Sequence, residues 1–280
     1  MKTCDLHTHS VFSDGTCTPA KLIRLAKAAG LSAVALTDHN TVAGLSDFLV
    51  AAEGSGVEAV PGVEFSTDYG EKELHILALF VKPEHYAVIT EVLEDASRRK
   101  EQSNIDLVQA LNRAGYALDY AAIKARTPNG QVNRAHIAAE LTRLGYTADI
   151  QAAFKQLLSP KRGLYVPPKR MGSTEAIRFI KSLGCTAVLA HPFLNMDEAL
   201  LRAFLPEAVA AGLDGMEVAY SKYSPETTAL AVKIAEEFGL KPSGGSDFHG
   251  ENKPDITIGT GRGDLAIAMD WLEELRPMGK

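Results

Sequence analysis

The stretch Cys4-Asp5-Leu6-His7-Thr8-His9-Ser10-Val11-Phe12-Ser13-Asp14-Gly15 combines a short apolar run with two histidines and a carboxylate. Alternate residues of a β-strand point to the same face, so His7 and His9 can approach one ion where the strand ends. Asp14 follows in the loop and can return to the same place. A His-x-His pair alone is also common on surfaces and in cores, so the rest of the chain must decide between the two interpretations.

Side chains of the same kinds recur along the chain. Apolar runs at 33–37, 58–63, 186–190 and 241–246 are each followed by a histidine or a carboxylate. The carboxyl ends of the strands in a parallel barrel meet on one face, so such residues would lie together. A buried structural histidine explains any one of them taken singly, but their recurrence favours a shared site. The candidate metal ligands are His7, His9, Asp14, His39, Glu64, His75, His191, Asp247 and His249.

The alternation of strand and helix patterns predicts an α/β fold with a parallel, barrel-like sheet of about seven strands. After Pro83 the pattern changes, and helical spacing without strand-like enrichment continues to about residue 158. We therefore expect a barrel made of residues 1–97 and 165–280, with an all-helical insertion domain at 98–164.

Composition excludes several classes of protein. The chain has 280 residues, of which 46% are hydrophobic and 23% charged, as in ordinary globular proteins. No apolar run approaches membrane-spanning length, and an acidic residue comes too early for a secretory signal, so we expect a cytoplasmic protein without a membrane partner. Cys4, Cys17 and Cys185 are too widely spaced for a disulfide framework or a thiolate metal motif.

Charge is unevenly distributed along the chain. The net charge is −6, but residues 98–170 contain 13 Lys and Arg against five Asp and Glu, so this segment carries +8 and the remainder −14. Bound cations can offset acidic ligands in the body, and the basic segment can face an anionic substrate. The alternative is a solvated basic face of helices.

The candidate ligands offer nitrogen and oxygen atoms but no thiolate. This donor set suits Mn²⁺ best, with Zn²⁺ or Fe²⁺ as alternatives, and disfavours a structural zinc site. Nine ligands are too many for one ion, so two or three divalent ions are expected. A carboxylate such as Glu64 would then bridge a pair of them.

Four motifs together resemble the PHP (polymerase and histidinol phosphatase) family, which is related to the amidohydrolases. They are His7-x-His9 with Asp14, Asp38-His39, His191-Pro192 and Asp247-x-His249. The resemblance covers the chain outside the insertion and implies a distorted (β/α)7 barrel with a trinuclear metal centre. It implies a first metal held by His7, His9, Glu64 and Asp247, a second by Glu64, His75 and His191, and a third by Asp14, His39 and His249.

The insertion carries the segment Asn133-Arg134-Ala135-His136-Ile137-Ala138, and here the chain resembles the family's nucleoside 3',5'-bisphosphate phosphatases. That branch implies hydrolysis of the 3'-phosphate, as in conversion of adenosine 3',5'-bisphosphate to AMP and phosphate. Similar proteins act as 5' to 3' exonucleases on short oligonucleotides, which is the alternative, together with histidinol-phosphate phosphatase. A degenerate, non-catalytic metal-binding module is a further alternative. No obligate protein partner is evident.

The basic segment supplies candidate substrate-binding residues: Arg134, His136, Arg99 and Lys100. A guanidinium grips two phosphate oxygens at once, so Arg134 suits a second phosphate. No serine elbow or cysteine nucleophile is present, so a metal-bound hydroxide is the expected nucleophile and no general acid is assigned. Asp38 is expected to orient a ligand rather than to donate a proton.

Overall fold

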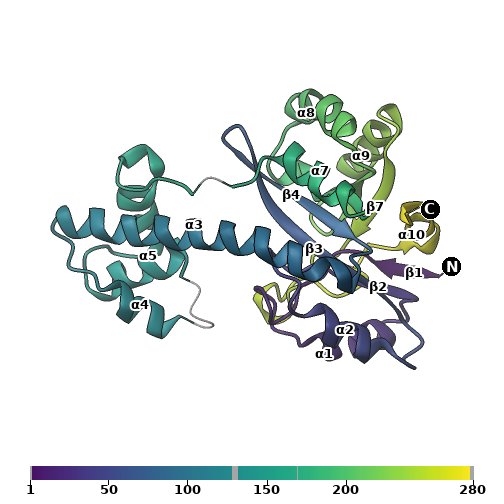
Figure 1. Cartoon of the computed structure of the whole chain (residues 1–280), viewed down its shortest axis with the longest axis horizontal. Coiled ribbons are helices and arrows are strands. Elements are labelled where there is room, and N and C mark those ends of the chain that lie inside the picture. The colour runs from purple at the N-terminus through teal and green to yellow at the C-terminus, as the bar shows by residue number, and fades with distance from the viewer. Residues whose placement is uncertain (1, 128–131, 169, 278–280) are drawn as a thin grey trace. The chain divides into compact units, whose positions relative to one another are not determined.

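The computed structural model describes residues 2–127, 132–168 and 170–277. The chain forms two compact units, which are drawn in Figure 1. The barrel unit comprises Met1–Glu91 and Met171–Lys280, and the helical unit comprises Val92–Arg170. The insertion predicted at 98–164 falls within the helical unit. Helix α3 (Tyr86–Arg113) begins in the barrel unit and continues into the helical unit.

The barrel unit is built around one eight-stranded sheet, with the order β7-β6-β5-β4-β3-β2-β1-β8. Its strands are β1 (Thr3–Asp5), β2 (Ala33–Leu36), β3 (Glu58–Tyr69), β4 (Lys72–Leu79), β5 (Thr186–Leu189), β6 (Gly215–Tyr220), β7 (Lys241–Gly245) and β8 (Ile267–Ala268). Several strands are buried along their whole length, as expected for a sheet covered by helices.

Backbone just beyond β1 and β7 joins the two ends of the sheet. The Leu6 N–H donates to the Gly244 carbonyl at 3.2 Å, and the Asp247 N–H donates to the His7 carbonyl at 2.9 Å. A parallel bridge pairs Thr8 with Phe248. These contacts form a seam that nearly closes the barrel, and the seam runs through two of the candidate ligands.

The α/β barrel fold class is confirmed, but the sheet differs in two respects from the parallel sheet of about seven strands that the sequence predicts. Strand β4 runs antiparallel to both β3 and β5, because only Gly70 and Glu71 separate β3 from β4. A parallel connection needs a crossover of a dozen or more residues. The eighth strand, β8, pairs antiparallel with β1 and has only two residues, too few to show a periodic pattern.

Helices cover the outside of the barrel. They are α1 (Pro19–Ala28), α2 (Leu45–Ala52), α7 (Ser173–Ser182), α8 (Glu198–Ala211), α9 (Pro225–Glu237) and α10 (Met269–Leu275). In Figure 1, α1 and α2 lie beside β1 and β2, whereas α7, α8 and α9 lie on the side of β4 and β7. Helix α1 begins as its sequence predicts, because Thr18 accepts from the Lys21 N–H at 3.2 Å and Pro19 takes the first position.

The helical unit has a hydrophobic core of its own. Besides most of α3 it contains α4 (Tyr120–Arg126), α5 (Arg134–Arg143) and α6 (Ile150–Ala153), followed by short turns at Phe154–Leu158 and Pro160–Arg162. Its core includes Leu107, Leu111, Ile123, Ile137, Leu141 and Leu158. None of the helices in the described residues is both long and apolar enough to span a membrane.

Candidate metal centre

The candidate ligands come from successive strand ends of the barrel unit. His7 and His9 follow β1, His39 follows β2, and His191 follows β5. Glu64 was expected at the end of a strand, but it lies inside β3, which continues to Tyr69. The extension exists because β3 pairs with β4 as a hairpin, which also places His75 diagonally across from Glu64 on the neighbouring strand.

Glu64 is the common neighbour of five histidines. Its side chain is fully buried, and no lysine or arginine is paired with it among the described residues. The Glu64 Oε2 atom lies 3.1 Å from His7 Nε2, 3.3 Å from His9 Nε2 and 3.0 Å from His39 Nδ1, and Oε1 lies 2.8 Å from His75 Nδ1 and 3.1 Å from His191 Nε2. One carboxylate therefore serves both sides of the cluster, which suits a bridging ligand.

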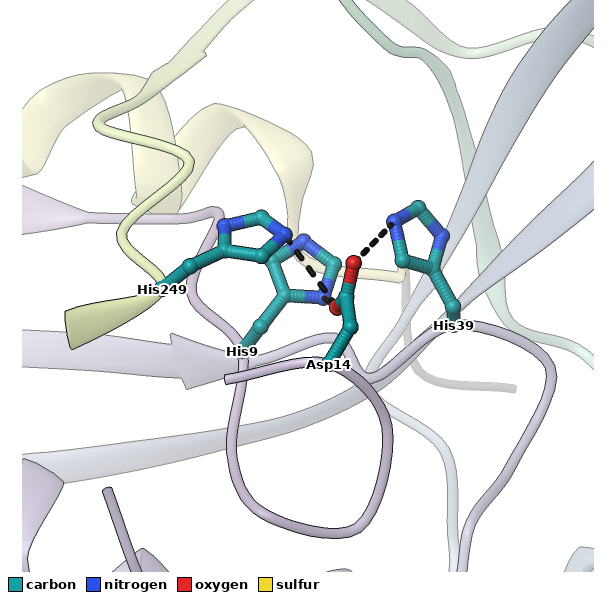
Figure 2. Close-up of side chains that lie close together, drawn as sticks. All are labelled: His9, Asp14, His39 and His249. Carbon is teal, nitrogen blue, oxygen red and sulfur yellow. Dashed lines mark ion pairs between the residues drawn. The ribbon is translucent and has the colours of Figure 1, made fainter. Parts of the chain in front are cut away.

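A second group gathers around Asp14, as Figure 2 shows. The Asp14 Oδ1 atom lies 3.2 Å from His249 Nε2 and 3.8 Å from His9 Nδ1, and Oδ2 lies 3.9 Å from His39 Nε2. The Asp14 side chain is 55% exposed, whereas His9 and His249 are buried. This group thus has one side open to solvent.

Within the described residues, four sets have ligand atoms that all lie within 4.8 Å of one another. They are His9, Asp14, His39 and His249; His7, His9 and Glu64; His7, His191 and Glu217; and His39, Glu64 and His75. The structure thus brings the sequence-predicted ligands into one continuous cluster. Asp247 joins it through Oδ1, which lies 3.3 Å from His9 Nε2.

The buried nitrogens of this cluster fit divalent cations. Neither ring nitrogen of His9 makes a well-aligned hydrogen bond in the described structure, although Nε2 lies 3.3 Å from Glu64 Oε2, and the same holds for Nδ1 of His39, which lies 3.0 Å from that oxygen. Leaving such a group buried and unpaired costs about 1–3 kcal/mol, so native proteins rarely tolerate several together. Coordination to an ion satisfies a neutral imidazole nitrogen directly, and the surrounding carboxylates supply the negative charge.

The pKa values show how strongly the cluster attracts positive charge. Burial alone would lower the pKa of His9, but the carboxylates of Asp247 and Glu64 outweigh it and raise that pKa to about 9. Burial is likewise overcome at His75, where Glu64 raises the pKa to about 10. Burial would raise the pKa of Glu64, yet the charges of His39, His7 and His75 hold it well below its usual range. A metal ion must displace these protons, so metal binding depends on pH.

Comparisons with known proteins agree with this geometry. Residues 5–164 match the PHP domain. The chain is 34% identical to a 5'-3' exoribonuclease of Haemophilus influenzae over 249 residues, covering 89% of this chain and 90% of the relative. It is 32% identical over 260 residues to a 3',5'-nucleoside bisphosphate phosphatase of Chromobacterium violaceum, covering 91% of each chain. The chain belongs to the PHP domain family.

A solved structure supports the same assignment. An amidohydrolase from Chromobacterium violaceum, with bound sulfate and no metal, superposes with a TM-score of 0.76 at 28% sequence identity. The match covers 99% of this chain and 98% of that one. The resemblance inferred from the sequence motifs is therefore confirmed, and the chain is a metal-dependent PHP phosphoesterase.

Glu217 is a residue of the metal centre that the sequence motifs did not reveal. Its Oε1 atom lies 2.9 Å from His7 Nδ1, and its Oε2 accepts from the His191 N–H at 2.7 Å. A carboxylate on the second nitrogen of a ligating histidine fixes the tautomer and the orientation of the ring. The available signal was a single acid within the apolar strand Gly215–Tyr220.

Asp247 is also held from its outer side. The Tyr220 hydroxyl donates to Asp247 Oδ2 at 2.8 Å, and the Lys253 ammonium donates to the same oxygen at 2.6 Å. These contacts leave Oδ1 directed toward His7 and His9. Two donors on one oxygen thus fix which oxygen faces the cluster.

Two further buried carboxylates accept from backbone N–H groups and serine hydroxyls rather than from a histidine ring. Asp38 accepts from the Ser10 N–H at 2.7 Å and from the hydroxyls of Ser10 and Ser13 at 2.5 Å each. It therefore fixes the loop that carries Asp14, and its contacts are with that loop and not with a ligand ring. Asp5 accepts from the Ser246 N–H at 2.9 Å and from its hydroxyl at 2.6 Å, which ties β1 to the loop after β7.

Backbone strain is concentrated beside the cluster. His191 has φ 29°, Asp247 has φ 56° and Asn40, next to His39, has φ 51°. Non-glycine residues rarely adopt positive φ, and the cost of order 1–3 kcal/mol persists only where the surroundings impose it. The strand ends are thus bent so that these side chains face one another.

The four predicted substrate-binding residues lie in the helical unit. The Arg134 guanidinium stacks 4.5 Å from the centre of the Tyr165 ring, and His136 Nδ1 accepts from the Asn133 N–H at 3.1 Å as part of the α5 cap. Arg99 pairs with Asp95, one turn earlier in α3, and Lys100 is exposed. Their binding role stays a prediction.

Proposed function

We propose that this PHP phosphoesterase removes the 3'-phosphate from nucleoside 3',5'-bisphosphates, converting adenosine 3',5'-bisphosphate to AMP and phosphate. The observation that carries the proposal is the buried Glu64 carboxylate within 3.3 Å of five histidine nitrogens, beside the half-exposed Asp14. Such a set of ligands can hold more than one divalent ion at a site open to a substrate.

The similar proteins narrow the substrate class. One acts on nucleoside bisphosphates and another is an exoribonuclease, and both substrates carry a phosphate on the 3'-oxygen of a nucleotide. The phosphate is a monoester in the first case and a diester in the second. A 5'-3' exoribonuclease activity is therefore our second candidate, favoured by the 34% identity to the Haemophilus protein.

We propose that the cluster holds two or three divalent ions, with Mn²⁺ as the native metal and Zn²⁺ or Fe²⁺ as substitutes. Bound ions would lower the pKa of a coordinated water and offset charge on the phosphoryl oxygens. The protein's own contribution is orientation. Glu217 fixes the His7 ring, Tyr220 and Lys253 fix the Asp247 carboxylate, and Asp38 fixes the loop that carries Asp14.

Binding of the 5'-phosphate is assigned to the helical unit. Arg134 is the principal candidate, because a guanidinium offers two parallel donors to a phosphate and this one is already held by stacking on Tyr165. His136, Arg99 and Lys100 are proposed to add to the positive field around it. Histidinol phosphate carries one phosphate and a positively charged amine, so the basic segment would add less to its binding affinity.

The test compares three substrates, each with Mn²⁺. Phosphate release is measured from adenosine 3',5'-bisphosphate and from histidinol phosphate, and nucleotide release is measured from a short 5'-phosphorylated RNA. We expect the highest kcat/KM for the bisphosphate. Glu64→Gln should abolish turnover of every substrate and lower metal content, whereas the exposed Glu53→Gln should change neither. Full turnover in Glu64→Gln would refute the metal centre, and a preference for RNA would make the exoribonuclease the main activity.

A further inference from the structure

Lys253 places a positive charge at the edge of the metal centre, within the barrel unit. Its ammonium donates to Asp247 Oδ2 at 2.6 Å. In the described parts of the chain, no other lysine or arginine forms an ion pair with one of the nine predicted ligands. Other cations of the barrel unit pair away from the cluster, as Lys181 does with Asp214. The position of Lys253 therefore sets it apart from the other cations of this unit.

The orientation of the Asp247 carboxylate does not require this charge. The hydroxyl of the buried Tyr220 already donates to the same oxygen at 2.8 Å, and the Tyr220 ring is held 5.3 Å from the His191 ring. This neutral donor is enough to leave Oδ1 facing His9. Partial removal of an ammonium from water costs more free energy than removal of a neutral donor. The charge of Lys253 thus points to a second partner.

The Lys253 ammonium has further donors for such a partner. A lysine ammonium carries three N–H groups, and Asp247 is the only acceptor that Lys253 Nζ has among the described residues. The Lys253 side chain is 28% exposed. Glu251 forms no ion pair with it within the described ranges, and Asp255 is held by the Arg262 guanidinium at 2.7 and 3.0 Å. The remaining N–H groups are therefore left for solvent or for a ligand.

The turn that carries Lys253 is fixed to the loop on the open side of the centre. The Asn252 side-chain amide donates to the Asp14 carbonyl at 2.7 Å, and the Glu251 N–H donates to the Thr16 hydroxyl at 2.9 Å. Asp14 is the ligand whose side chain is 55% exposed. An anion that reaches the cluster from solvent beside Asp14 therefore meets a turn that presents a cation.

We propose that Lys253 is a catalytic residue that donates to an oxygen of the phosphate to be hydrolysed, and that its charge favours a phosphate monoester over a diester. The ammonium and the ligand cluster contact the two oxygens of one carboxylate, that of Asp247, so a phosphate bound at the cluster lies close to this cation. A monoester carries about two negative charges near neutral pH and a diester about one, so the monoester is attracted more strongly. The inference rests on the proposed function, because it requires a phosphate at the metal centre.

The first test is calorimetric titration of inorganic phosphate into the Mn²⁺-loaded full chain. Lys253→Gln keeps a donor for Asp247 but removes the charge, so we expect the Mn²⁺ content of the wild type and a Kd for phosphate raised at least about tenfold. Lys253→Arg should recover most of the affinity. Tyr220→Phe is the matched control, because it removes the other donor to Asp247 Oδ2 and should change that Kd less than about threefold. Lys233→Gln removes an exposed cation that pairs with Glu237 on α9 and should change neither quantity.

Kinetics with two small substrates test the preference for a monoester. The substrates are p-nitrophenyl phosphate, a monoester, and bis(p-nitrophenyl) phosphate, a diester with the same leaving group. Lys253→Gln should lower kcat/KM for the monoester at least about fivefold more than for the diester. Unchanged phosphate affinity, equal losses on both substrates, or a loss of Mn²⁺ equal to that in Tyr220→Phe would overturn the role of Lys253. Phosphate binding that depends on Lys253 in a chain that hydrolyses no phosphate ester would refute the proposed function and leave the phosphate contact standing.

Discussion

Gly245 lies where the two ends of the barrel meet, and replacing it by alanine tests whether that seam positions the metal ligands. A Cβ atom at Gly245 would lie 2.2 Å from His7 Cβ, 2.6 Å from His7 N and 2.9 Å from His7 Cα. All three atoms belong to a segment held by backbone hydrogen bonds on either side, from Leu6 to Gly244 and from Asp247 to His7. The added methyl group must therefore displace His7 itself.

The size of the displacement sets the expected loss. Carbon atoms pack at about 3.5–4.0 Å, so the 2.2 Å contact requires a shift of more than about 1 Å. Overpacking of this kind typically costs about 1–3 kcal/mol of folding free energy. A misplacement of about 1 Å at a reacting centre can cost about a hundredfold in rate. Gly245→Ala should thus lower kcat/KM by about two orders of magnitude while the protein still folds.

The assay combines thermal unfolding, metal content after dialysis and phosphate release at saturating Mn²⁺. Gly172→Ala is the matched control, because a Cβ there meets nothing closer than 4.0 Å and φ is −66°. We expect Gly172→Ala to keep the metal content and the activity of the wild type. If Gly245→Ala also kept full metal content and activity, the seam would have no part in positioning His7.

Three further outcomes are expected. Removing the charge in Glu217→Gln should weaken metal affinity about 10- to 100-fold, measured by competition with a chelator, because His7 loses its carboxylate partner; wild-type affinity would contradict the orienting role. Treatment with EDTA should abolish activity and lower Tm, and Mn²⁺ should restore both; activity that survives complete metal removal would contradict metal dependence. Burial raises the pKa of Cys4 to about 12 and of Cys185 to about 11, from an ordinary value of 9.0. The stability that these protonated thiols contribute is therefore fully present below pH 9 and is lost as the pH rises through 11 and 12. The urea concentration at the midpoint of unfolding should fall between pH 8 and 10.5. It should fall less in a variant that carries both Cys4→Ala and Cys185→Ala. Rapid labelling of either native thiol at pH 8 would show that they are not buried.

Much of the barrel could be predicted because its polar residues interrupt apolar runs at regular places. His39 and His191 follow short buried strands, and a parallel arrangement brings such strand ends together whatever their distance in sequence. Helix caps such as Thr18 could also be predicted, because a cap depends only on residues that are adjacent in the sequence.

What could not be predicted depends on tertiary contacts. The reversal of β4 follows from a two-residue connection whose pairing partner lies elsewhere in the sheet, so apolar runs alone do not give its direction. Glu217 is one acid in an apolar strand, and only its place opposite His7 shows its role. Asp5 lies directly before the first histidine motif, but its contact with Ser246 depends on closure of the barrel and not on neighbouring residues.

Closure of the barrel also determines when the centre can assemble. Asp5 and Ser246 meet although they are 241 positions apart, and Asp247 and His249 emerge from the ribosome after Ser246. At typical rates of synthesis the first two histidines must wait roughly 10 to 50 seconds for these partners. During that time the nascent chain has a His-x-His pair without the carboxylate from the far end of the chain. The parts of the cluster that include Asp247 or His249 can therefore form only after translation has reached these residues, and a truncated chain that ends before Asp247 should bind fewer ions than the full chain.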